Sequence, residues 1–278
     1  MKNSTVNFTT SAALFESSDV LLRLHMSVHS INVLFGLPTH SFILWLIITS
    51  TGSGIASDFF NLNLSVCEIG ICLNSVSVIF YSLWFSSLSG LVYFLSGLGI
   101  TGRPLFQCLM CVERYLAVVH PVTFLKYKPL RYRLMCCTAA WIICLVSCFL
   151  CMFSVILLKY VLFIEFYSVQ FLVFLSIQLF CCLAVLRALK QSGPGERVRE
   201  REEENHMKRR AFHLILITTV NFLVIYLPFI TLGFYFILSK HYILELELAC
   251  LFVFSFASFV QPVLYLHRAG KLRSLCSP

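Results

Sequence analysis

Seven stretches of the chain are dominated by hydrophobic residues, and the segments between them hold most of the charged and turn-forming residues. Each stretch reaches the roughly 20 residues that an α-helix needs to cross the hydrocarbon core of a bilayer. The stretches cover residues 26–49, 58–81, 89–118, 134–157, 161–186, 211–237 and 246–266. This pattern predicts an all-α membrane protein, a bundle of seven transmembrane helices.

The overall composition agrees with a membrane bundle, because 59% of the 278 residues are hydrophobic and 12% are charged. Soluble domains have about twice that charged fraction. The net charge of +8 comes from basic residues in the loops after the third and fifth stretches and in the C-terminal tail. Basic residues concentrate in cytoplasmic loops, so we expect the N-terminus outside, the C-terminus in the cytosol, and no nucleic-acid partner.

The distribution of polar residues predicts one membrane domain between two tails. The regions are an extracellular tail at 1–25, a seven-transmembrane domain at 26–267 and a cytoplasmic tail at 268–278. Asn3 and Asn7 begin glycosylation sequons, which are usable only if this tail lies outside. Cys276 lies beside basic residues near the membrane and is a candidate for palmitoylation.

Patterns typical of catalysis or metal binding are missing from the sequence. It has no Ser/His/Asp set, no paired carboxylates that face a cleft and no phosphate-binding glycine loop. His40, His213 and His267 are too scattered to predict a metal site, and the thirteen cysteines fit no zinc or haem spacing. We therefore expect neither an enzyme nor a bound cofactor or metal.

The third stretch carries two arginines, Arg103 and Arg114, in an otherwise apolar segment. They are about three helical turns apart and lie on nearly the same face, which must point into the bundle because a charge facing lipid is costly. Glu68 lies roughly 15 Å deep in the second stretch, counted from Asp58, and Arg103 lies at a similar depth. We favour a direct Glu68–Arg103 ion pair; the alternative is that each is paired separately with water or other polar groups.

Short motifs follow one another in a fixed order along the seven stretches. They are Gly36-Leu37-Pro38-Thr39-His40, Asn63-Leu64-Ser65-Val66-Cys67-Glu68, Glu113-Arg114-Tyr115 with His120-Pro121, Trp141, Phe222 with Tyr226 and Pro228, and Gln261-Pro262-Val263-Leu264-Tyr265. In this order they resemble the motifs of the rhodopsin-like (class A) G-protein-coupled receptors. Within that family the chain is most similar to the purinoceptor-like or protease-activated-receptor-like branch.

Several positions depart from the family's residues. Glu68 stands in place of an aspartate, Tyr226 of a tryptophan, and Gln261 and His40 of asparagines. Ser89 occupies the position of the cysteine that forms the family's outer disulfide, so we expect no such disulfide.

The resemblance assigns roles to the motif residues. Arg114, between Glu113 and Tyr115, restrains the inner end of the bundle at rest and meets a G protein once active. Tyr226, Pro228, Gln261, Pro262 and Tyr265 belong to the segments that move. Lys208 lies where some members have an acid that holds this arginine; it would repel Arg114, which predicts raised basal signalling.

The resemblance also implies a sodium ion beside the acid of the second helix. In this chain the guanidinium of Arg103 would take the place of that cation. Residues 187–210 form the most charged stretch, which we interpret as either a helical extension or a flexible loop facing the G protein.

The predicted ligand pocket contains no charged side chain. Its residues, placed by the resemblance, are Ser96, Gly97, Ile100, Phe229, Gly233, Leu251 and Ser255. A pocket of this kind favours a neutral or apolar ligand, or none.

The leading interpretation is a receptor in the plasma membrane that transmits an unknown extracellular signal to a heterotrimeric G protein, with membrane lipid around it. One alternative is a receptor-fold protein without a ligand response, either constitutively active or a dimer partner. A second is a small transporter or channel, since an intramembrane arginine and glutamate suit a transport path.

Overall fold

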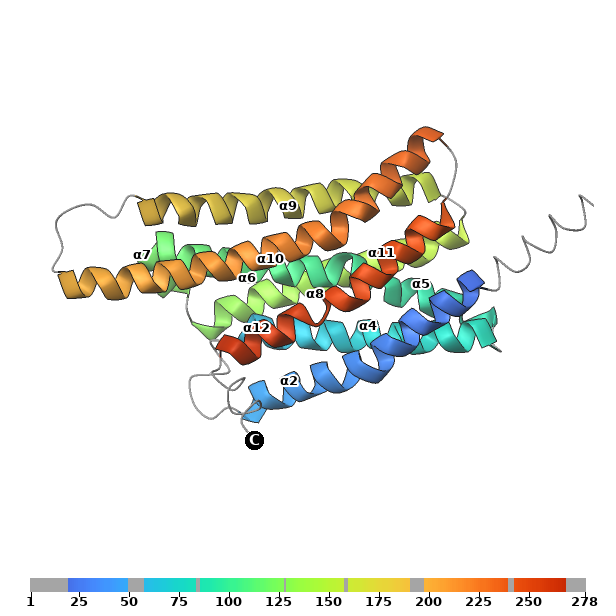
Figure 1. Ribbon diagram of the computed structural model, residues 1–278, viewed down its shortest axis with the longest axis horizontal. Coiled ribbons are helices and arrows are strands. Elements are labelled where there is room, and N and C mark those ends of the chain that lie inside the picture. Colours follow the sequence, from blue (N-terminus) through green and yellow to red (C-terminus); the bar gives the residue numbers. More distant parts are fainter. Residues whose placement is uncertain are drawn as a thin grey trace, which may run out of the picture.

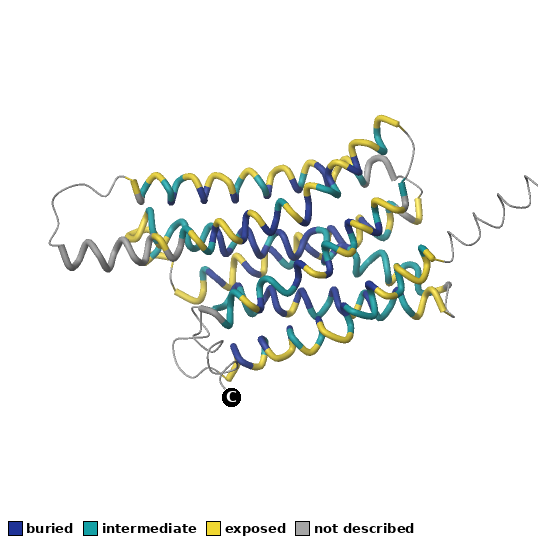
Figure 2. The backbone as a smooth tube through the Cα atoms, viewed as in Figure 1, coloured by how far each residue is buried: buried dark blue, intermediate teal, exposed yellow. Residues whose placement is uncertain are grey.

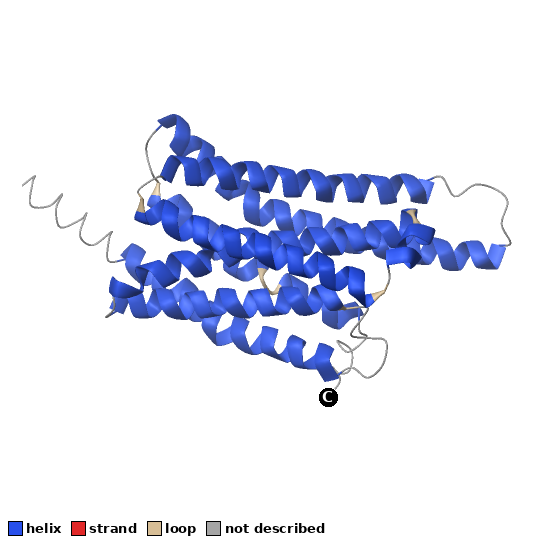
Figure 3. Ribbon diagram, turned by 180° about the vertical axis from the view of Figure 1, so that it is seen from behind, coloured by secondary structure: helices blue, strands red, loops and turns tan. Residues whose placement is uncertain are grey.

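The computed structural model describes residues 20–49, 58–83, 86–127, 129–157, 160–190, 198–239 and 243–268, which form an elongated bundle of helices (Figure 1). Within these ranges all regular structure is helical (Figure 3). The sequons at Asn3 and Asn7 and the cysteine at Cys276 lie outside the described residues.

Six helices of the described part are long and apolar enough to cross a membrane. They span Val20–Thr49, Phe59–Leu83, Leu130–Ser154, Ile164–Ala188, Phe212–Ser239 and Glu245–Leu266. The first begins before the predicted position 26, so residues 20–25 of the predicted tail are helical.

The remaining crossing is the third predicted stretch, which the structure divides into three pieces. These are α5 (Ser89–Gly97), one π-helical turn η3 (Leu98–Gly102) and α6 (Arg103–Val119). Alone, α6 has 17 residues and carries Arg103, Glu113 and Arg114, so it is too short and too charged to be recognised as a span. Joined to α5 through η3, it completes the predicted seven-helix bundle.

Most of the other elements fall on the predicted stretches, whereas residues 86–88 and 121–127 form short helices between them. The other elements are η1 (Asn32–Gly36), α2 (Leu37–Thr49), α4 (Phe59–Leu83), η2 (Ser86–Leu88), α7 (Pro121–Tyr127), α8 (Leu130–Ile156), α9 (Tyr160–Lys190), α10 (Val198–Ser239), α11 (Leu244–Ala257) and α12 (Val260–Arg268). Because α10 begins at Val198, its part of the charged stretch is a helical extension rather than a loop.

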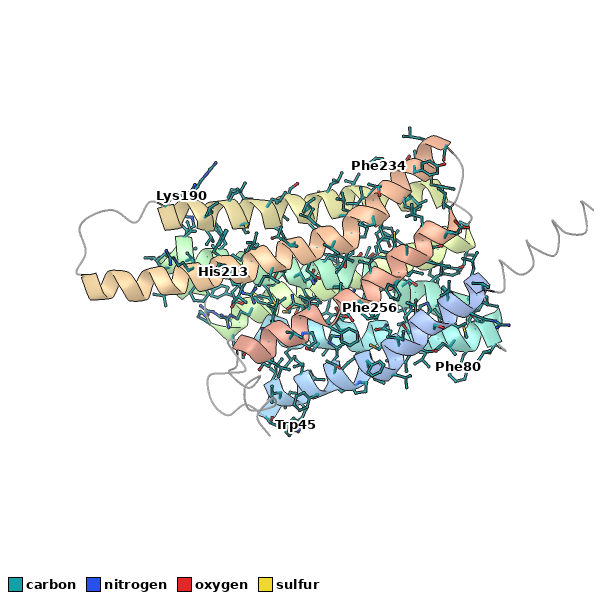
Figure 4. The ribbon with its side chains drawn as sticks, in the orientation of Figure 1. Trp45, Phe80, Lys190, His213, Phe234 and Phe256 are labelled. Atoms are coloured by element: carbon teal, nitrogen blue, oxygen red, sulfur yellow. The ribbon has the colours of Figure 1, made fainter. Side chains whose placement is uncertain are left out.

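Buried residues run along the middle of the bundle, where α6 packs against α4, α9 and α10 (Figure 2). Phe106, Met110 and Cys111 of α6 are almost fully buried and belong to the core. Large apolar side chains also cover the outside, and Trp45 and Phe80 point away from the bundle (Figure 4). An apolar exterior of this extent suits hydrocarbon rather than water.

Candidate functional site

The π turn η3 has a local cause in the sequence. Pro104 has no N–H, so the carbonyl of Ile100 four residues earlier loses its helical donor, and the proline ring crowds that carbonyl. A single π turn widens the helix and relieves this crowding. The turn ends at Gly102, and α6 then begins with Arg103 and has Pro104 in its first turn.

Arg103 and Glu68 form a bidentate ion pair between α6 and α4. Arg103 Nε donates to Glu68 Oε1 at 2.6 Å, and Arg103 Nη2 donates to Glu68 Oε2 at 2.7 Å. Both residues are 1% exposed. The structure therefore brings together Glu68 and Arg103, whose depths and helix faces suggested a pair. Two parallel charge-assisted hydrogen bonds fix the plane of the guanidinium.

Phe254 of α11 supplies the other contacts of the guanidinium. Its backbone carbonyl accepts a hydrogen bond from Arg103 Nη1 at 3.1 Å. Its ring lies 3.8 Å from Arg103 Cζ, a cation–π contact. One side chain on α6 is thereby held by α4 and α11 together, so the charge connects the second, third and seventh crossings.

His40 also lies near the Glu68 carboxylate, with Nε2 at 3.8 Å from Glu68 Oε2. That nitrogen is buried and has no hydrogen-bond partner among the described residues, and the same holds for Gln261 Nε2. Both residues line a cavity of about 10 Å³, which is roughly the space of one water molecule. Its lining residues are His40, Ile43, Asn61, Leu64, Ser65, Glu68, Gln261, Pro262 and Tyr265.

The π turn itself is bonded to three further helices. The hydroxyl of Tyr226 in α10 donates to the Gly99 carbonyl at 3.2 Å. The hydroxyls of Thr101 and Ser147 are hydrogen-bonded to each other, which ties η3 to α8. Gln170 Nε2 of α9 donates to Thr101 Oγ1 at 2.9 Å. Residues 98–103 of the third crossing therefore form polar bonds to the second, fourth, fifth, sixth and seventh crossings.

Near the C-terminal end of α6, Glu113 forms an ion pair with Arg133 of α8. Tyr115 OH is hydrogen-bonded to His120 Nε2 at 3.0 Å, and the two rings meet edge to face. The glutamate beside Arg114 is thus engaged by another helix. The side chain of Lys208, which we expected to repel Arg114, lies outside the described part of the chain.

The seventh crossing is interrupted between α11 and α12, at Ser258 and Phe259. Pro262 cannot donate to the Ser258 carbonyl, which lies four residues earlier. The hydroxyl of Ser258 donates to the Ser255 carbonyl at 2.7 Å. The helix is therefore broken just before Pro262. Gln261 and Tyr265 follow the break and line the small cavity near Glu68.

Trp141 shows how the motif residues fit together. Its Nε1 donates to Asn63 Oδ1 at 2.8 Å, which joins α8 to α4.

The family description "7 transmembrane receptor (rhodopsin family)" matches residues 40–265, most of the chain. The chain belongs to the rhodopsin family of seven-transmembrane receptors. A rhodopsin-family protein is a receptor and not an enzyme.

A human relative, the C-C chemokine receptor type 8, is 27% identical over 178 residues. The match covers 57% of this chain and 46% of the relative, so the chain spans less than half of that receptor in the alignment. The purinoceptor-like or protease-activated-receptor-like branch stays a prediction.

In this rhodopsin-family receptor, two of the residues predicted to line a ligand pocket instead lie where helices touch. A Cβ at Gly97 would come within 2.6 Å of the Cys148 backbone, and one at Gly233 within 2.9 Å of Ile164 Cγ2. The two glycines allow α5 to pack on α8 and α10 on α9. Both glycines therefore contribute close helix contacts.

The other predicted pocket residues are spread over several helices. Ser96 Oγ donates to the Val92 carbonyl at 2.8 Å and accepts from Asn74 Nδ2 at 3.2 Å. Phe229 meets Phe254 edge to face. Ser255 is buried, whereas Ile100 and Leu251 are half-buried. The ligand pocket assigned to these residues stays a prediction.

Several residues that hold the receptor's polar centre were not predicted from the sequence. Pro104 and the two glycines before it, Gly99 and Gly102, indicate an irregular turn inside the third stretch. Phe254 acts through its backbone carbonyl and ring, for which no sequence pattern exists. Ser147 and Gln170 are single polar residues in apolar stretches, and such residues do tend to face the bundle interior.

Proposed function

We propose that the chain is a plasma-membrane receptor that passes an extracellular signal to a heterotrimeric G protein, with its N-terminus outside. Family membership and the position of Arg114 near the inner end of α6 support this proposal. The mechanism is a population shift in which the inner part of α10 moves outward and uncovers Arg114.

The observation that carries the proposal is the retention of Glu113-Arg114-Tyr115 at the end of a helix whose middle is anchored by the buried ion pair. The middle of α6 is fixed and its inner end is half-buried, so a conformational change can take place at the inner end alone. Glu113 pairs with Arg133, so at rest the triplet is connected to α8.

We further propose that Arg103 serves as an internal cation in place of sodium. Its guanidinium holds both carboxylate oxygens of Glu68, the acid at the position where the family resemblance implies a sodium ligand. A tethered cation does not dissociate, so the resting state of this receptor does not depend on external sodium. The ligand that we propose is neutral or apolar, because no charged residue belongs to the predicted pocket.

Basal recruitment of a G protein by the intact receptor tests the signalling proposal. We expect recruitment by the wild-type receptor without ligand, and its loss in Arg114→Ala. Arg131→Ala is the matched control, since Arg131 is an exposed arginine stacked on Tyr132 and should leave recruitment unchanged. A wild-type receptor that reaches the surface and recruits no G protein, with and without a ligand library, would contradict the proposal.

A receptor-fold protein without a ligand response is the second candidate. It is favoured by the tight glycine contacts at Gly97 and Gly233, which bring helices together where a ligand pocket was expected. The same assay separates it from the first, because it predicts no ligand-dependent change. The transporter alternative has no comparable support, since Glu68 and Arg103 are sealed in a fixed pair.

A further inference from the structure

Two histidines lie one turn apart near the beginning of the first helix, away from the ion pair. His25 Nε2 and His29 Nε2 face each other at 3.3 Å, and the rings are arranged edge to face. Both side chains are half-buried. Neither residue belongs to a family motif or has a part in the signalling mechanism, so the pair needs its own explanation.

Hydrogen bonds to Ser75 of α4 fix the orientation of His29. Asn32 Nδ2 donates to Ser75 Oγ at 2.8 Å, and the Ser75 hydroxyl donates to the Ile71 carbonyl. The serine oxygen is therefore an acceptor for His29 Nδ1, which lies 3.1 Å away. His29 consequently carries its proton on Nδ1 and has a lone pair on Nε2, directed at His25.

The separation of the two nitrogens fits a metal ion. In tetrahedral zinc sites the Zn–N bonds are about 2.0–2.1 Å, so two ligating nitrogens stand about 3.3–3.4 Å apart. The observed 3.3 Å matches this value without any movement of the backbone. A histidine that binds a metal through one ring nitrogen usually donates a hydrogen bond from its other ring nitrogen to a neighbouring oxygen.

The electrostatic surroundings also suit a cation. Glu247, in the first turn of α11, is close enough to His25 to act on it electrostatically. A carboxylate beside two imidazoles offsets the charge of a divalent ion, and imidazole selects zinc, copper or nickel over magnesium or calcium. No three histidine, cysteine or acidic residues gather as a complete metal site in the described ranges, so water would fill the remaining positions.

We propose that His25 and His29 bind one transition-metal ion, with zinc as the test case, between the first helix and the start of α11. Ser75 is a positioning residue for His29, and Glu247 supplies the countercharge. Under the orientation given in the proposed function, this site opens to the outside of the cell. External zinc would then stabilise the contact between the first and seventh crossings.

Zinc binding to the purified full-length receptor in nanodiscs, after treatment with a chelator, tests the site. We expect one zinc ion per chain and a rise of roughly 5 °C in melting temperature at saturation, with no comparable effect of magnesium. His25→Ala and His29→Ala should each weaken binding at least about tenfold, and Ser75→Ala about tenfold through loss of the ring orientation. His213→Ala, which removes an exposed histidine of α10, is the matched control and should bind normally.

Binding that is absent, or that is unchanged in both histidine variants, would overturn the proposal. The melting temperature of each variant without zinc shows whether it is folded, and Ser75→Ala keeps both ligands if a histidine variant fails to fold. Nanodiscs expose both faces of the membrane, so the zinc-binding result does not depend on orientation.

An epitope tag at the N-terminus, stained in intact and in permeabilised cells, tests the orientation separately. Staining only after permeabilisation would place the site on the cytosolic side and contradict its access to external zinc.

Discussion

The two π turns of the receptor, η1 and η3, have the same local cause and very different surroundings. Each ends in a glycine that is followed by one residue and a proline, Gly36-Leu37-Pro38 in the first helix and Gly102-Arg103-Pro104 in the third. In both, the missing N–H and the bulk of the proline ring favour a widened turn just before it. A short sequence pattern therefore predicts where the helix is irregular.

The neighbours decide what each irregular turn does. Around η1, Leu34 and Phe35 are 67% and 61% exposed, and the polar contact is a single buried asparagine, Asn32, that reaches Ser75. Around η3, Thr101 and Arg103 are buried and bond to other crossings. The same irregular turn is peripheral in the first helix and central in the third, because the described part of the third crossing packs against more helices than that of the first.

Removal of the acid beside η3 should have the largest effect. Glu68→Ala leaves the guanidinium of Arg103 buried without its carboxylate, and breaking a buried ion pair costs about 3–5 kcal/mol. We expect little folded protein, measured as the fraction that elutes as a monodisperse receptor and as its free energy of unfolding in mixed micelles.

Two further variants show that this cost belongs to the ion pair. Asp58→Ala removes another acid, just before the start of α4 and away from the ion pair, and should cost about 1 kcal/mol or less. The double variant Glu68→Leu/Arg103→Met, which removes both charges, should recover most of the lost stability. Equal losses in the single and double variants would contradict the pairing.

Pro104→Ala tests the origin of η3. The restored N–H allows an ordinary α turn, which moves the carbonyl of Gly99 and the hydroxyl of Thr101 away from their partners. We expect a loss of roughly 1–3 kcal/mol in the free energy of unfolding, since buried polar groups lose hydrogen bonds. A variant as stable as the wild type would show that the turn is not needed for these bonds.

Tyr226→Phe removes one bond of the turn and nothing else. The hydroxyl is 3.2 Å from the Gly99 carbonyl, and the ring, packed between Phe171 and Phe222, stays in place. We expect a loss of about 0.5–1.5 kcal/mol, measured by the same unfolding experiment. In the Pro104→Ala background the loss should be smaller, because the bond is already broken there.

Pro38→Ala applies the same test to η1. Pro38 is exposed, and the turn before it has few polar bonds to other crossings. We expect a change within about 0.5 kcal/mol in either direction. A loss as large as that of Pro104→Ala would mean that the irregularity itself, and not its neighbours, stabilises the bundle.

Hydropathy and motif order were sufficient to predict the fold. Seven apolar stretches gave the crossings, and depth along two of them suggested Glu68 as the partner of Arg103, since rise per residue converts position into depth. The proline and glycines around η3 were present in the sequence but were not recognised as a π turn.

Other parts of the polar centre depend on contacts that cannot be predicted from the residue type alone. The carbonyl of Phe254 becomes available through its position on α11, and the packing of Gly97 and Gly233 depends on which helix faces them. A resemblance to a family assigns these two glycines to positions along their helices, but it does not give the spacing between the helices that they contact.

The direct test of the internal cation is the effect of sodium on the melting temperature of the purified receptor. Sodium chloride is compared with choline chloride at equal ionic strength, for the wild type and for Arg103→Ala, which leaves Glu68 without its guanidinium. Our account predicts no sodium-specific change in the wild type and a sodium-dependent rise in melting temperature in Arg103→Ala. A wild-type receptor that is specifically stabilised by sodium would contradict it, because the place of the cation would then not be filled by Arg103.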